Sequence, residues 1–127
     1  MPSQSRHFGN IAVAIPVGRL DHSSAADFEQ GLLPLVEDPQ VAGLIVDLAN
    51  VEYISSMGLR VLMLAAKAMR GRKARIGAVA LQPIVAEIFA ISRFDSVFEM
   101  YPTLPAALDA MSRDARVAYD AASSPGV

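Results

Sequence analysis

The fold of this chain is decided around one stretch, Val51-Glu52-Tyr53-Ile54-Ser55-Ser56-Met57-Gly58-Leu59-Arg60-Val61-Leu62. Residues 41–48 before it are a nearly continuous apolar run typical of a buried strand, and residues 57–70 have helical apolar spacing. The turn between them presents two serine hydroxyls where the N–H groups of a new helix point outward, which suits a phosphate. No base, thiol or metal cluster lies near them in sequence, so the pattern indicates a regulatory site rather than a catalytic one.

Composition places the chain among small globular proteins. Its 127 residues are 53% hydrophobic and 19% charged, which fits one domain with a real core and an apolar surface patch. The net charge of −2 argues against nucleic-acid binding, and the lack of cysteine excludes disulfides and a thiol nucleophile. The sequence contains no run of about 18 apolar residues, so a membrane-spanning helix is not expected. Residues 1–10 lack the apolar centre of a signal peptide. We therefore expect a cytoplasmic protein.

Strand and helix patterns alternate along the chain. Strands are predicted at 11–17, 41–48, 75–81 and 97–100, and helices after Ser23 or Ser24, over 57–70, from Pro83 to 92, and after Thr103. This order predicts an α/β fold with a four- to five-stranded, mostly parallel sheet, an N-terminal edge strand and about four helices. Residues 18–21 have the pattern of a turn. The core is expected over residues 10–112, and residues 113–127 are expected to form a flexible tail.

Two local features qualify this outline. Gly31 and Pro34 should make the first helix kink or end early. The helix over 57–70 carries a second apolar strip, which either lies buried within the domain or docks a partner. A basic cluster over residues 70–75 is interpreted as a solvated helix end.

Three segments resemble the STAS domain family, which is named for sulphate transporters and anti-sigma factor antagonists. Residues 53–59 (Tyr-Ile-Ser-Ser-Met-Gly-Leu) resemble its Asp-Ser-Ser/Thr-Gly-Leu phosphorylation motif. Residues 18–22 (Gly-Arg-Leu-Asp-His) resemble its first-strand exit, and residues 81–89 resemble its third helix. The resemblance covers roughly residues 10–112 and implies a STAS-type fold, with Ser56 as the phosphate acceptor.

In anti-sigma factor antagonists, such a motif implies partner switching. The unphosphorylated protein binds an anti-sigma factor serine kinase and frees a sigma factor, the kinase phosphorylates the serine, and a serine phosphatase resets the cycle. The chain would then be a substrate and a binder, not an enzyme. Here Ser55 replaces the aspartate usual before the acceptor, and Met57 follows the acceptor. Ser55 is therefore an alternative phosphorylation site, and both serines are also good helix caps.

The predicted partner surface surrounds the serine turn. Its members are the polar residues after the first strand and the outward positions at the start of the second helix: Asp21, His22, Ser55, Ser56, Met57, Gly58, Arg60, Val61 and Leu64. Asp21 and His22 are equally consistent with a turn aspartate and a solvated histidine. No cofactor is expected, and the distant His7 and His22 do not form a metal-binding pattern. The apolar helix strip is compatible with a monomer or a weak dimer.

Three functions remain open at this point. The first is a single-domain anti-sigma factor antagonist. The second is a STAS subunit that docks constitutively, such as the small partner of a lipid-transport ABC ATPase, because the motif aspartate is missing. The third is an enzyme or small-ligand sensor, which no visible constellation of residues supports.

Overall fold

The computed structural model describes residues 4–123. Its strands are β1 (Gln4–Phe8), β2 (Ile11–Ile15), β3 (Gly18–Leu20), β4 (Gly43–Asp47), β5 (Val51–Ile54), β6 (Arg75–Val79) and β7 (Glu99–Tyr101). Its helices are α1 (Ala25–Glu37), α2 (Ser56–Gly71), α3 (Pro83–Ile91), the short 3₁₀ helix η1 (Phe94–Ser96), α4 (Leu104–Met111) and α5 (Arg113–Ser123).

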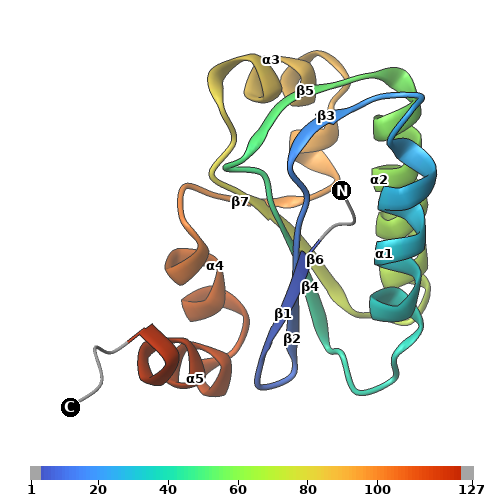
Figure 1. Cartoon of the computed structure of the whole chain (residues 1–127). Helices are drawn as coiled ribbons and strands as arrows, with labels where there is room; N and C mark the ends of the chain where they lie inside the picture. Colours follow the sequence, from blue (N-terminus) through green and yellow to red (C-terminus); the bar gives the residue numbers. More distant parts are fainter. Residues whose placement is uncertain (1–3, 124–127) are drawn as a thin grey trace.

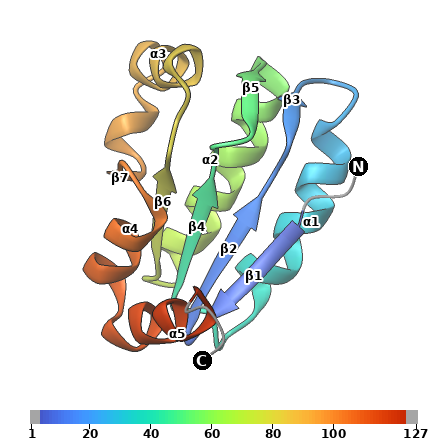
Figure 2. The same ribbon diagram turned by 60° about the vertical axis from the view of Figure 1, so that its left-hand side comes forward.

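The main sheet has five strands in the order β1-β2-β4-β6-β7. Strand β1 pairs with β2 in antiparallel fashion, and the other neighbours are parallel. Strands β3 and β5 form a separate parallel pair beyond the carboxyl ends of β2 and β4 (Figure 2). The predicted α/β class, the mostly parallel sheet and the N-terminal edge strand are confirmed.

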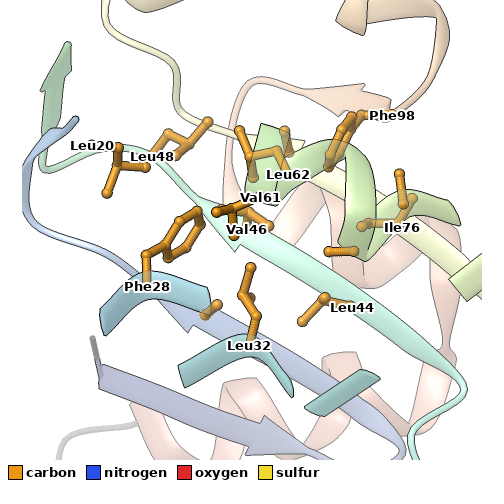
Figure 3. Close-up of a cluster of buried hydrophobic side chains, with 14 of the residues drawn as sticks. Leu20, Phe28, Leu32, Leu44, Val46, Leu48, Val61, Leu62, Ile76 and Phe98 are labelled. Atoms are coloured by element: carbon orange, nitrogen blue, oxygen red, sulfur yellow. The ribbon is translucent and has the colours of Figure 1, made fainter. Parts of the chain in front are cut away.

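Helices cover both faces of this sheet. Helices α1 and α2 lie side by side on one face, and α4 and α5 lie on the other (Figure 1). Alternate residues of β4 explain the two layers: Leu44 and Val46 join the core under α1 and α2, while Ile45 joins the core under α4 and α5. Figure 3 shows Phe28 and Leu32 of α1 in the first core. The apolar run at 41–48 is thus a central strand with both faces buried.

Two short strands, β3 and β5, were not predicted from the sequence. Residues 18–21 were expected to be a turn, but Gly18–Leu20 forms β3, and Val51–Ile54 forms β5. Each is too short for a clear period, and each is paired with the other rather than with a sequence neighbour. Their hydrogen bonds therefore depend on tertiary contact, which local pattern does not reveal.

The C-terminal part of the described chain and helix α1 are both more regular than predicted. The expected tail instead begins with α5, whose Ala115 is fully buried and whose Tyr119 ring lies edge-on to Phe8 at 5.4 Å. Residues 124–127 of the expected tail lie outside the described residues. Helix α1 also continues through Pro34 to Glu37, because the burial of Leu35 and Val36 outweighs the lost backbone hydrogen bond.

The basic cluster after α2 is partly structural: Arg70, Lys73 and Arg75 are exposed, as predicted, but Arg72 is half-buried. The guanidinium of Arg72 donates hydrogen bonds to the carbonyls of Val36 (2.9 Å), Asp38 (2.8 Å) and Val41 (2.6 Å). Arg75 pairs with Glu99 at 2.6 Å. Arg72 therefore fixes the end of α1 against the end of α2, and so sets the spacing of these two helices.

Candidate functional site: the serine turn and the α1–α2 groove

The β3–β5 pair brings two polar turns together. Leu20 lies opposite Ile54 in this pair, and the Ser55 N–H donates a hydrogen bond to the Leu20 carbonyl at 2.8 Å. Because the strands are parallel, the residues that follow them leave the same edge. Asp21 and the two serines therefore lie at one end of the molecule, as predicted from the sequence.

The two serines have different local structures. Ser55 is the N-cap of α2: its backbone is extended, and its hydroxyl accepts a long hydrogen bond from the Gly58 N–H at 3.5 Å. Ser56 is the first residue of α2 and is exposed. Within residues 4–123, the Ser56 hydroxyl makes no hydrogen bond to another side chain or to the backbone. The capping contact occupies Ser55, whereas the Ser56 hydroxyl is open to a second protein.

Gly58 lets α2 approach β3 closely. A Cβ atom at this position would lie 2.6 Å from the Leu20 carbonyl oxygen and 2.9 Å from Cγ2 of Ile54. Both distances are shorter than side chains tolerate, so any larger residue would push the first turn of α2 away. The glycine therefore sets the position of Ser56 relative to Asp21 and is itself buried.

The turn after β3 is fixed by hydrogen bonds to Asp21. Its carboxylate accepts from the Ser23 hydroxyl at 2.7 Å and from the Ser23 N–H at 3.0 Å, and Arg19 lies 3.7 Å away. The Ser23 hydrogen bonds hold the pKa of Asp21 below its usual range. Asp21 is therefore ionised at neutral pH, and the adjacent His22 side chain is exposed.

A groove runs between α1 and α2 from the serine turn. Its upper part has a volume of about 250 Å³ and is lined by His22, by α1 residues Ala25, Ala26 and Glu29, and by α2 residues Met57, Arg60, Val61 and Leu64. It continues as an apolar furrow lined by Glu29, Leu32, Leu33, Val36, Val61, Leu64, Ala65 and Ala68. Met57 (46% exposed), Leu64 (44%) and Leu33 (43%) leave apolar surface open along it. Such a surface is typical of a protein-docking site.

The second apolar strip of α2 is neither fully buried nor fully free. Val61 and Ala65 are buried beneath α1, whereas Leu64 and Ala68 remain exposed along the groove. The α1 wall was missed in the sequence, where α1 was treated only as a core helix. Exposed Leu33, which lies off its buried face, was the one available signal.

Nothing among the described residues suggests bound metal. Residues 4–123 contain no group of three or more histidine, aspartate or glutamate side chains that could hold a metal ion. His7 lies in β1 opposite Ala12. Over the same part of the chain, no helix is both long and apolar enough to cross a membrane.

Comparison with known proteins identifies the family of the chain. The model of the STAS domain family matches residues 4–107. BtrV of Bordetella bronchiseptica, named as a candidate anti-sigma factor antagonist, is 34% identical over 88 residues, which are 69% of this chain and 75% of BtrV. The anti-sigma-F factor antagonist RsfB of Mycobacterium tuberculosis is 30% identical over 98 residues, which are 77% of this chain and 79% of RsfB.

A solved structure has the same architecture. The crystal structure of an anti-sigma factor antagonist from Mycobacterium paratuberculosis superposes with a TM-score of 0.79 at 28% sequence identity. The match covers 86% of this chain and 92% of that one. The similarity therefore includes most of the fold.

Proposed function

The chain belongs to the STAS domain family, and from this membership we propose that it is an anti-sigma factor antagonist controlled by phosphorylation of Ser56. The observation that carries the proposal is the exposed Ser56 at the first residue of α2, next to Met57, which lines the open groove. The names of the related proteins favour this function over a constitutively docking transport subunit.

The proposed cycle follows from these parts. Unphosphorylated, the protein binds an anti-sigma factor serine kinase through the serine turn and the groove, which releases a sigma factor. The kinase then phosphorylates Ser56 and dissociates, and a serine phosphatase restores the binding form. The chain itself performs no chemistry in this cycle, and the cycle runs in the cytoplasm.

A phosphate on Ser56 would change binding more than folding. It adds about −1.5 to −2 charges at neutral pH. The free N–H groups and dipole at the start of α2 tolerate such an anion, so the fold should persist. A partner packed over Ser56 would have to strip water from the dianion. A loss of about 2–4 kcal/mol there weakens binding roughly 30- to 1,000-fold.

The local structure favours Ser56 over Ser55 as the acceptor. The hydroxyl of Ser55 faces the Gly58 N–H, and a kinase would have to break this cap to reach it. Ser56 requires no such rearrangement. The motif aspartate is absent, and Asp21, the ionised carboxylate at the same end of the molecule, is engaged by Ser23.

The test is the phosphorylation state in the native host. The protein is purified from growing and stressed cells, and its intact mass is measured together with peptides that cover residues 53–60. We expect one added phosphate on Ser56, lost in Ser56→Ala and retained in Ser55→Ala. Phosphate on Ser55 would refute the residue assignment, and its absence under every condition would favour a constitutive docking subunit.

A further inference from the structure

Arg60 is a cation at the serine end of the groove, and the proposed cycle gives this residue no role of its own. Its side chain is exposed and lines the upper groove beside Met57 and His22. Across residues 4–123, it takes part in no ion pair or hydrogen bond through its guanidinium. By contrast, Arg70 and Arg72, at the C-terminal end of α2, both donate to backbone carbonyls.

The position of Arg60 on α2 suits an anion on Ser56. The two residues are four apart in one helix, so they share a face and their Cα atoms are about 6 Å apart along the axis. Helical side chains point toward the N-terminus, which directs the long Arg60 side chain back over Ser56. An acidic group placed four residues before a basic one is also the favourable order for such pairs.

We propose that Arg60 binds the phosphate of phosphorylated Ser56 within the same chain and holds it across the mouth of the groove. This inference rests on the proposed function, since it requires a phosphate on Ser56. The guanidinium fork matches phosphate oxygens and gives charge-assisted hydrogen bonds. The backbone amides of the first turn of α2 also attract the phosphate, but they do not determine its orientation.

The charged groups near Arg60 do not prevent it from pairing with a phosphate on Ser56. Asp21, on the β3–α1 connection, is already engaged by Ser23 and Arg19. Glu29 projects from α1 into the same groove and carries a single negative charge, so a phosphate dianion competes with it for Arg60. His22 lies at the same mouth and adds no negative charge.

The pairing makes phosphorylation a two-part switch. The phosphate adds charge and bulk at the serine turn, and it draws the Arg60 side chain, which lines the groove, toward Ser56. It also removes Arg60 from the surface that faces the partner. A partner that places a carboxylate near Arg60 would therefore lose its counter-charge at the same moment.

The test uses protein with phosphoserine incorporated at position 56 during translation, so it needs no kinase. The titration of the phosphate is followed by ³¹P NMR in the parent, Arg60→Ala, Arg60→Lys and the control Lys67→Ala. Lys67 is an exposed cation on α2, three turns from Ser56 and beyond the Debye length at physiological salt. The Nε–Hε signal of Arg60 is recorded with and without the phosphate.

We expect the Arg60→Ala titration midpoint to lie about 0.5 pH higher than that of the parent. Arg60→Lys should fall between the two, and Lys67→Ala should match the parent. The Arg60 Hε signal should move downfield only in the phosphorylated protein. Equal midpoints in the parent and Arg60→Ala, or an unmoved Hε signal, would overturn the inference. An unphosphorylated Ser56 in the host would instead refute the proposed cycle and leave this titration interpretable.

Discussion

Replacing Gly58 by alanine tests whether the close contact between α2 and β3 affects stability more than helix propensity does. Gly58 has ordinary helical geometry, so alanine is compatible with its backbone and would by itself favour the helix by about 1 kcal/mol. The added Cβ would, however, lie 2.6 Å from the Leu20 carbonyl oxygen and 2.9 Å from Ile54. The carbonyl belongs to the β3 backbone and cannot rotate away.

The steric cost should exceed the gain in propensity. Overpacking of this kind costs about 3 kcal/mol when the neighbour is backbone, which leaves a net loss of roughly 2 kcal/mol. For a domain of this size, that loss lowers Tm by roughly 8 °C. The first turn of α2 should also move away from β3, which displaces Ser56 from Asp21 and weakens partner binding.

The assay is urea unfolding followed by far-ultraviolet circular dichroism, with Gly71→Ala as the matched control. Gly71 is the last residue of the same helix, and no atom lies within 4 Å of the Cβ it would gain. Gly71→Ala should therefore be neutral or slightly stabilising. If Gly58→Ala is as stable as the parent, or if both variants change alike, the close approach does not constrain α2.

Three further predictions follow from the packing and charge. Arg72→Lys should lose about 1–2 kcal/mol in urea unfolding, because an ammonium cannot serve three carbonyls at once, and an unchanged midpoint would contradict this. Hydrogen bonds from Arg75 hold the pKa of Glu99 below its usual range, so the stability gained from the pair is fully present above the ordinary pKa of a glutamate and is lost as the pH falls through the lowered pKa. Glu99→Gln should lower the free energy of unfolding by about 0.5–1 kcal/mol at neutral pH and by less at acid pH. A loss that is the same at every pH would argue against the pair. Leu64→Asp should weaken binding to the partner kinase at least tenfold by calorimetry, and Val117→Asp, an exposed apolar control on α5, should not; equal losses would remove the groove from the interface.

Much of the fold could be predicted because its signals are local. The run at 41–48 marks a strand with both faces buried, and the spacing over 57–70 marks the amphipathic α2. The serine turn between them was likewise visible, and with it Ser55, Ser56 and Met57. Prediction failed at β3 and β5, which are stabilised by each other, and at α5, whose weak pattern is compensated by burial of Ala115 against the sheet.

The sequence by itself determined the alternation of strands and helices and the place of two hydroxyls at a helix start. Both depend on the periodicity of neighbouring residues. Only the tertiary structure decided how closely Gly58 approaches Leu20, and that Glu29 and Leu33 of α1 complete a groove with α2. These features join residues far apart in the chain, and their geometry is set by strand pairing and by the contacts of Arg72, which no local pattern encodes.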